Sequence, residues 1–261
     1  MVMKLEIQNL TFSYDGEKNV FEDVSLSYQS PEIFCLLGAN GTGKSTLLKN
    51  IIGEYKPKEG RILIDGKLLK NYSARKLAQK IAYIPQSHVP AFPFSVIEVV
   101  LMGRTSRIGY FSTPGKAEEG SAMKRLEFLN IGHLRDKAYT DISGGERQLV
   151  LIAAALNQEP EVLILDEPTS HLDFGNQYRF IHLIGKLQKE GMGVIMTTHF
   201  PDHALELKGK TSIMKDKGIV KTGPAADVVT SQNMKELYQI EVNVKTFGKR
   251  SICIPGRIDE D

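Results

Sequence analysis

The sequence has two cysteines in 261 residues, almost no net charge and no long hydrophobic run. Cys35 and Cys253 lie far apart, so they offer no disulfide framework, and this usage fits a reducing compartment. A net charge of +2 is too close to balance to favour DNA or RNA, so no nucleic-acid partner is expected. Cys35 stands within the apolar run at residues 33–37, which predicts a buried free thiol.

Signals for crossing a membrane are also missing. No window approaches the roughly 18 consecutive apolar residues of a membrane-spanning helix. The first six residues, MVMKLE, contain no apolar core of a signal peptide. We therefore expect a soluble chain that reaches a membrane only through a partner.

The composition that is present is ordinary for a globular protein, with 41% hydrophobic and 25% charged residues. The length allows one large α/β domain or one domain with an inserted subdomain. We expect a single domain over residues 1–261.

The order of hydrophobic segments predicts an α/β fold. Short apolar segments up to residue 30, with a turn at Asp15 and Gly16, predict antiparallel strands. From Val162 on, strands and helices alternate, which predicts a parallel sheet. The expected core elements are strands at 33–37, 61–64, 81–84, 162–166 and 193–198, helices at 44–52 and 174–189, and, near the end, a short helix at 234–238 with two weak strands.

A helical pattern separates the strands at 81–84 and 162–166. A loop rich in proline and aromatic residues, 89–94, precedes Ser95 and Glu98, whose spacing is that of a capping box. Residues 96–157 show no strand pattern and are interrupted at 112–115 and at Gly132. We expect a helical subdomain, residues 87–157, inserted into the sheet domain.

Residues 38–45, GANGTGKS, match the P-loop pattern G-x-x-x-x-G-K-[ST]. The glycines let backbone N–H groups turn toward a phosphate chain, and the helix that follows places its positive end there. Lys44 can reach the β- and γ-phosphates and Ser45 can hold Mg²⁺. The strand before and the helix after favour this interpretation over a chance glycine-rich turn.

Asp166 and Glu167 end a short apolar run, so they emerge at the carboxyl edge of the sheet, where open α/β folds bind ligands. Asp166 suits the Mg²⁺ shell, and Glu167 suits the positioning or deprotonation of an attacking water. The alternative is a surface acidic pair that caps the next helix. The neighbouring P-loop favours the catalytic interpretation.

A third segment, SGGE at residues 143–146, is not needed by an ordinary P-loop enzyme. Its serine and two glycines open a helix and form a second anion site. One chain has no second triphosphate to offer this site, so the pattern indicates that the protein acts in pairs.

Together these segments resemble the nucleotide-binding subunits of ABC transporters over nearly the whole length. SGGE is similar to the family signature LSGGQ, with Ile142 and Glu146 at the two positions that differ. Gln86 resembles the Q-loop glutamine and His199 the switch histidine. The segment SHLD at 170–173 resembles the family's D-loop, and Tyr14 resembles the aromatic residue that stacks on adenine in the family.

The resemblance implies a RecA-like P-loop NTPase core that binds ATP and Mg²⁺. Glu167, His199, Lys44 and Gln86 would carry hydrolysis, and Ser45, Gln86 and Asp166 would hold Mg²⁺. In a head-to-tail dimer, the signature of one copy would cover the ATP on the P-loop of the other. The implied nucleotide contacts are Tyr14, Gly38, Ala39, Asn40, Gly41, Thr42, Gly43, Lys44, Ser45, Thr46, Ser143, Gly144, Gly145, Glu146 and Asp173.

Three positions leave alternatives open. Glu146 puts a carboxylate near a phosphate site, where it either faces away or moderates ATP affinity. Ala154 stands where the family often has arginine, so an ion pair on that helix is expected to be missing. His199 and His203 are spaced as metal ligands can be, but no third ligand lies nearby, and a loop histidine satisfied by its neighbours is the other interpretation of His199.

The segments 84–104 and 167–177 are similar to the ATPases of metal-chelate importers. That group handles ferric siderophores, haem, cobalamin and molybdate or tungstate. The implied partners are two membrane-spanning permease subunits and, indirectly, an extracytoplasmic substrate-binding protein, with the chain peripheral on the cytoplasmic face of the membrane. Phe92, Phe94 and Met102 would contact the permease, or else belong to the subdomain core.

Two rival functions use the same motifs. A soluble ABC ATPase can serve as an assembly factor, as in iron–sulfur cluster biogenesis, and the length of this chain permits that. A DNA-repair ATPase needs a long coiled-coil insertion or a second ATPase half, and the sequence has neither.

Overall fold

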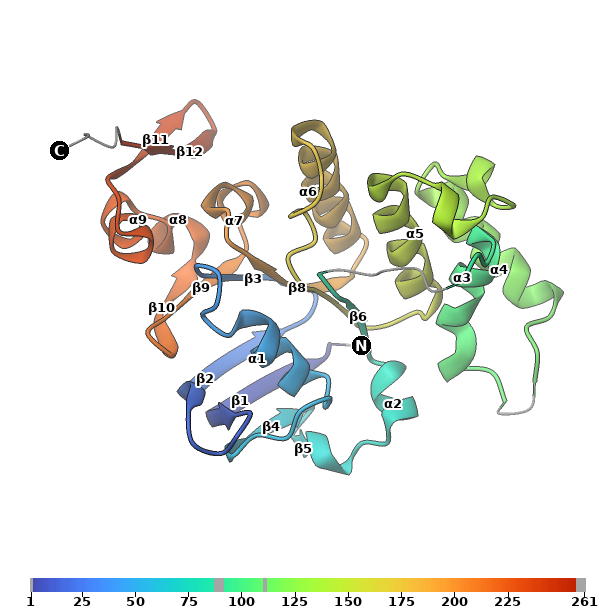
Figure 1. Cartoon of the computed structure of the whole chain (residues 1–261), viewed down its shortest axis with the longest axis horizontal. Helices are drawn as coiled ribbons and strands as arrows, with labels where there is room; N and C mark the ends of the chain where they lie inside the picture. The colour runs from blue at the N-terminus through green and yellow to red at the C-terminus, as the bar shows by residue number, and fades with distance from the viewer. Residues whose placement is uncertain (1, 87–91, 110–111, 257–261) are drawn as a thin grey trace.

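The computed structural model describes residues 2–86, 92–109 and 112–256. Three sheets and the helices around them make up this part of the chain (Figure 1). The strands are β1 Lys4–Ser13, β2 Asn19–Gln29, β3 Ile33–Leu37, β4 Glu59–Ile64, β5 Lys67–Leu68, β6 Ile81–Ile84, β7 Val162–Leu165, β8 Gly193–Thr198, β9 Lys210–Lys215, β10 Gly218–Pro224, β11 Val242–Phe247 and β12 Arg250–Pro255. The α-helices are α1 Lys44–Ile51, α2 Ala74–Ala78, α3 Val96–Met102, α4 Lys116–Phe128, α5 Gly144–Asn157, α6 Phe174–Lys189, α7 Pro201–Leu207, α8 Ala225–Val228 and α9 Ser231–Tyr238.

The central sheet has six strands in the order β10-β9-β3-β8-β7-β6. All neighbouring pairs are parallel except the edge pair of β9 and β10. Because β3, β8, β7 and β6 lie side by side and run the same way, the four segments that follow them meet at one edge of the sheet. The predicted α/β class with a parallel core is confirmed.

Both faces of this sheet are covered, which explains why β3 and β7 are apolar without alternation. On one face, Phe34 and Leu36 pack with α1 and with the antiparallel sheet. On the other face, Cys35 and Leu37 pack with α3 and the helices α5, α6 and α7. Cys35 is a free, fully buried thiol as predicted, and burial raises its pKa to about 12.

The first strands form the predicted antiparallel sheet, in the order β2-β1-β4-β5. Leu5, Ile7 and Leu10 of β1 point into the same core as α1. The pairing register of β1 with β2 shifts around Leu10 and Phe12.

The segment between β6 and β7 is helical where the structure describes it. The Glu98 carboxylate accepts hydrogen bonds from the Ser95 N–H and hydroxyl, both at 2.7 Å, as the capping-box spacing predicted. Residues 87–91 lie outside the described residues. The start of the predicted loop at 89–94 and the start of the predicted subdomain at 87 therefore also lie outside them. The domain limits 1–261 and 87–157 stay predictions.

The last part of the chain carries α8, α9 and the hairpin of β11 and β12, which lie beside α7 (Figure 1). None of the helices in the described ranges has both the length and the apolar character needed to cross a membrane.

Candidate functional site

The carboxyl edge of the central sheet collects most of the predicted site. Gly38 follows β3, Gln86 follows β6 by two residues, Asp166 follows β7, and His199 follows β8. These strands are neighbours, so residues more than a hundred positions apart in the sequence come within hydrogen-bonding distance.

The loop at residues 38–45 has the backbone of a phosphate cradle. Gly41 and Gly43 have φ of +79° and +98°, a region that side chains rarely adopt. A Cβ on Gly38 would come within 2.7 Å of the Met214 carbonyl oxygen, so only glycine fits there. Lys44 Nζ donates to the carbonyl oxygens of Gly38 at 2.9 Å and Ala39 at 3.0 Å, which draws the loop around its own lysine.

Asp166 is held by three hydroxyl groups and is 2% exposed. Its Oδ1 accepts from Ser45 Oγ at 2.9 Å and from Thr197 Oγ1 at 2.7 Å. Its Oδ2 accepts from Tyr83 at 3.3 Å. The carboxylate and the P-loop hydroxyl therefore lie together, as a site of hard oxygen ligands requires.

Glu167 lies at the centre of the cluster. Its Oε1 forms an ion pair with Lys44 Nζ at 3.0 Å, and its Oε2 lies 3.0 Å from His199 Nδ1. Burial alone would raise the pKa of this carboxyl, but Lys44 and His199 outweigh burial and hold the pKa below its ordinary value. Glu167 is therefore ionised at neutral pH.

The backbone of Glu167 is strained, with a φ of +41°. Such strain costs on the order of 1–3 kcal/mol and persists only where the surroundings fix it. Here the N–H of Glu167 donates to Thr197 Oγ1 at 2.8 Å, in a fully buried position. This contact lies next to the carboxylate that pairs with the P-loop lysine.

Two further predicted residues border the cluster. Tyr14 is 65% exposed and its hydroxyl lies 2.8 Å from Thr46 Oγ1, so its ring stands over the start of α1. Gln86 Nε2 donates to Glu167 Oε2 at 3.4 Å. Both positions are compatible with the roles that the resemblance implies.

The two histidines of the pair His199 and His203 make separate contacts. No cluster of three or more histidine, cysteine or acidic side chains with metal-binding geometry occurs among the described residues. His199 faces Glu167, whereas His203 Nδ1 lies 3.1 Å from Thr198 Oγ1. Burial and the neighbouring His199 lower the pKa of His203 to about 4.

The signature segment begins α5, with Ser143 at the N-cap. The Glu146 carboxylate turns back and accepts from the Ser143 N–H at 2.8 Å and hydroxyl at 2.7 Å. These hydrogen bonds lower the pKa of Glu146. Glu146 thus faces the Ser143 donor groups and does not point away from them.

Asp173 caps α6, with Oδ1 accepting from the Asn176 N–H at 2.8 Å. A Cβ on Gly145 would lie 3.9 Å from Leu172 Cδ2, so the signature and the D-loop are neighbours. The helices α1 and α5 pack on opposite faces of the central sheet (Figure 1). The phosphate loop and the signature therefore belong to two separate groups of site residues.

Sequence reasoning missed Thr197 and Tyr83. Thr197 is a buried hydroxyl inside an apolar strand, and periodicity does not mark it. The parallel register was the available signal, since Leu165 pairs with Met196 and the next residues are Asp166 and Thr197. Tyr83 lies on β6, and burial and Asp166 raise its pKa, so it remains a neutral donor.

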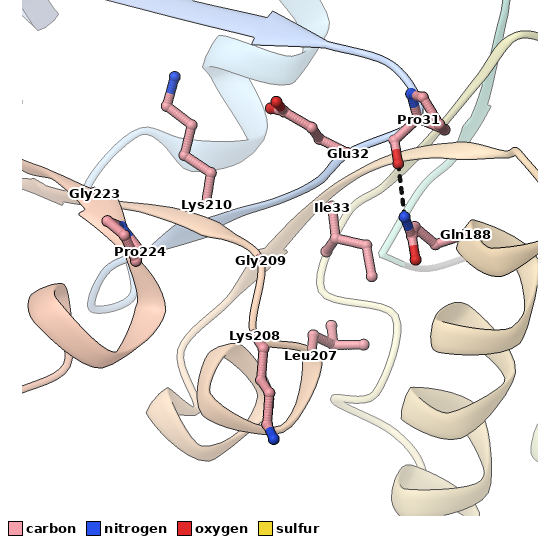
Figure 2. A pocket seen from close by; sticks show the side chains of 10 residues that line it. All are labelled: Pro31, Glu32, Ile33, Gln188, Leu207, Lys208, Gly209, Lys210, Gly223 and Pro224. Carbon is pink, nitrogen blue, oxygen red and sulfur yellow. Dashed lines mark hydrogen bonds between the residues drawn. The ribbon is translucent and has the colours of Figure 1, made fainter.

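A surface hollow of about 520 Å³ lies away from this site (Figure 2). It is lined at the amino ends of β3 and β9, by Ile33 and Lys210, and Gln188 closes one side by donating to the Pro31 carbonyl at 2.9 Å. The P-loop follows the other end of β3. None of the predicted site residues lines the hollow.

Comparison with known proteins agrees with the clustered motifs. Residues 21–170 match the family described as "ABC transporter". The chain belongs to this family. As a member it is an ATP-hydrolysing ABC protein, and the nucleotide-binding and ATPase predictions are confirmed at that level.

ABC relatives extend over nearly the whole chain. An uncharacterised ABC transporter ATP-binding protein of Haemophilus influenzae is 41% identical over 91% of this chain and 90% of its own length. The molybdate import ATP-binding protein MolC of the same organism is 35% identical over 90% of this chain and 88% of its own. The hemin import ATP-binding protein HmuV of Hahella chejuensis is 35% identical over 87% of this chain and 90% of its own.

Solved ABC structures confirm the fold. A chain of an ABC transporter described as metal-chelate type, in an inward-facing conformation, superposes with a TM-score of 0.85 at 32% identity and covers 98% of both chains. An ATP-binding cassette of an ABC transporter in its ADP conformation superposes with a TM-score of 0.81 at 25% identity, covering 91% of this chain and 98% of that one.

Proposed function

We propose that this ABC ATPase powers an importer of a metal chelate: a ferric siderophore, haem, cobalamin, or molybdate or tungstate. Relatives of similar length that are named for molybdate and hemin import support this class of substrate. The metal-chelate type transporter with a TM-score of 0.85 supports the same class. The chain would work on the cytoplasmic face of the membrane with two permease subunits and, indirectly, an extracytoplasmic binding protein.

The proposed chemistry rests on one observation: Lys44, His199 and Gln86 all meet the carboxylate of Glu167. When ATP enters the loop, Lys44 would leave Glu167 for the β- and γ-phosphates. The freed, ionised carboxylate would orient the attacking water and accept its proton. His199 would donate to the γ-phosphate and hold the in-line geometry.

The residues around Ser45 fit a magnesium ion. The Ser45 hydroxyl and Asp166 carboxylate lie 2.9 Å apart, and both are oxygen ligands of the kind that Mg²⁺ prefers. Ser45, Asp166 and Gln86 would hold the ion beside the loop. When bound, Mg²⁺ neutralises charge that develops on the phosphates.

The separation of the two groups of site residues supports a dimer as the working unit. Ser143, Gly144 and Gly145 would complete the ATP site of a second copy, and Asp173 would lie beside them. Closure on two ATP molecules would pull on the permease subunits, and loss of the γ-phosphate would let the dimer open.

An exposed apolar group supports a permease contact. Phe92, Phe94 and Met102 are 65%, 43% and 46% exposed, so the alternative that they form the subdomain core loses support. The ring centroids of Phe92 and Phe94 lie 5.9 Å apart, and apolar side chains exposed together are typical of interaction sites.

The competing proposal is a soluble assembly ATPase, and one experiment separates the two. The Glu167→Gln variant is incubated with ATP and detergent-solubilised native membranes, and the proteins retained with it are identified. Recovery of a polytopic membrane subunit supports the importer. Recovery of soluble partners alone contradicts the importer. Glu161→Gln, which changes a carboxylate at the other end of β7, serves as the control variant.

A further inference from the structure

We infer that Tyr238, near the carboxyl end of the chain, is a positioning residue for the histidine His199. The Tyr238 hydroxyl donates to the His199 carbonyl oxygen at 2.6 Å across 39 residues of sequence. The inference rests on the role proposed above for His199.

The His199 carbonyl needs a hydrogen-bond donor from elsewhere, because it lies just before the start of α7. Helix α7 begins at Pro201 with Phe200 as its N-cap. The first carbonyl that the helix uses belongs to Phe200, which accepts from the His203 N–H at 3.2 Å. The His199 carbonyl lies one residue before this point, so a group from elsewhere must satisfy it.

The N–H of the same peptide group is also fixed. The Phe200 N–H donates to Thr198 Oγ1 at 3.0 Å. Tyr238 and Thr198 therefore hold the C=O and the N–H of the peptide group that joins His199 to Phe200, directly after the Cα that carries the His199 side chain. That side chain then places Nδ1 3.0 Å from Glu167 Oε2.

The segment that carries Tyr238 is itself tied to α7. The Cys253 N–H in β12 donates to Asp202 Oδ1 in the first turn of α7, at 2.8 Å. Arg250 forms an ion pair with Glu206, further along α7, at 3.1 Å. The hairpin thus contacts α7 in its first turn and further along, and α9 contacts the segment just before α7 through Tyr238.

Position matters for this histidine because a catalytic donor must stand within a fraction of an ångström of its target. Removing the Tyr238 hydroxyl would leave the His199 carbonyl unsatisfied and let the segment shift. The variant should lose turnover rate (kcat) and keep its affinity for ATP, because other elements make the nucleotide contacts of the P-loop.

The test is Tyr238→Phe, which keeps the ring and removes only the hydroxyl. Tyr72→Phe is the matched control, because the Tyr72 hydroxyl also donates to a backbone carbonyl, that of Ile64 at 3.0 Å, away from the site. We expect kcat to fall about three- to tenfold, as for loss of one hydrogen bond. KM for ATP should stay within about twofold and Tm should change no more than in the control.

The inference is overturned if Tyr238→Phe turns over ATP like Tyr72→Phe, or if its activity falls only in step with the folded fraction. Measuring His199→Ala alongside separates the two claims. If His199→Ala is inactive and Tyr238→Phe is normal, the inference fails while the proposed function stands. If His199→Ala hydrolyses ATP at the normal rate, the role of His199 fails and the inference fails with it.

Discussion

At the residue scale, the site depends on buried polar groups that satisfy one another. The side chains of Lys44 and Glu167 are 3% and 8% exposed, so their ion pair lies almost entirely out of contact with water. Thr197 joins the two halves of the acidic pair, since its hydroxyl donates to Asp166 and accepts from the Glu167 N–H. Removing one member of such a network leaves its partners unpaired, which costs more than the bond itself contributes.

Thr197→Val should therefore lower the free energy of unfolding by about 1–3 kcal/mol, because it removes one of the three hydroxyl donors of Asp166 and leaves the buried Glu167 N–H without its acceptor. Thr211→Val is the matched control: Thr211 is also fully buried, and within the described part of the chain its Oγ1 has no hydrogen-bond partner. Denaturant unfolding should show the control within about 0.5 kcal/mol of the wild type or more stable. Equal losses in the two variants would contradict the assigned network.

At the element scale, the residues at the start of α5 cap the helix and are also proposed to contact phosphate. Ser143 and Glu146 form a capping box that stabilises the helix. The same Ser143 donor groups are proposed to meet the phosphate of a second copy. An ionised carboxylate on those donors competes with phosphate, so the helix start is more stable and the anion site weaker than with a neutral side chain.

Glu146→Gln should keep the cap, since glutamine also serves in capping boxes, and remove the competing charge. In the Glu167→Gln background, the ATP concentration for half-maximal dimer formation should fall about two- to fivefold, as expected for roughly 0.3–1 kcal/mol of charge at a helix end. Glu98→Gln changes the equivalent capping box of α3 and should leave that concentration unchanged. An unchanged or higher concentration for Glu146→Gln would contradict the competition.

Elements with a long or uniformly apolar pattern were predictable from the sequence, whereas short helices without a capping motif were not. The strands β3 and β8 and the helix α6 were predicted to the residue. The two strands are continuous apolar segments, and the 16-residue helix has one apolar face, so few other secondary structures fit these patterns. The helices α2 and α7 have 5 and 7 residues, too few to show a helical period, and both were missed.

The site was predictable where a motif or a strand end marks a residue. Asp166 and Glu167 were found because they follow an apolar strand. The contact of Glu146 with Ser143 has the same S-x-x-E spacing that predicted the capping box at Ser95. The spacing was therefore a usable signal, although the resemblance to the family signature predicts a phosphate site there. Tyr238 carries no local signal, since its partner lies 39 residues away and only the fold joins them.

At the scale of the whole molecule, two cores stabilise the sheet from its two faces, and the ionisable groups near it respond to pH. His203, a residue of α7, is 9% exposed and stays neutral in the fold, because its pKa is lowered to about 4. In the unfolded chain it takes up a proton near its ordinary pKa of about 6.5. Its contribution to stability is therefore fully present above about pH 6.5 and is lost as the pH falls from there toward 4.

Stability measured between pH 7 and pH 4 should fall by about 3 kcal/mol more in the wild type than in His203→Asn. The exposed His182→Asn serves as the control and should keep the wild-type slope. Chemical unfolding at a series of pH values measures the difference. Identical slopes for the wild type and His203→Asn would show that His203 does not titrate as its surroundings indicate.

The central claim is that Glu167 drives hydrolysis in a dimer closed on ATP. Its direct test measures, for Glu167→Gln, the steady-state ATPase rate, the ATP affinity and the mass of the ATP-bound species. We predict a rate about 10²–10⁴-fold lower, an affinity within about threefold of the wild type, and a stable dimer with ATP. Glu161→Gln, which alters the carboxylate paired with Lys80, should behave as the wild type. A Glu167→Gln variant that hydrolyses ATP at the wild-type rate would contradict the account.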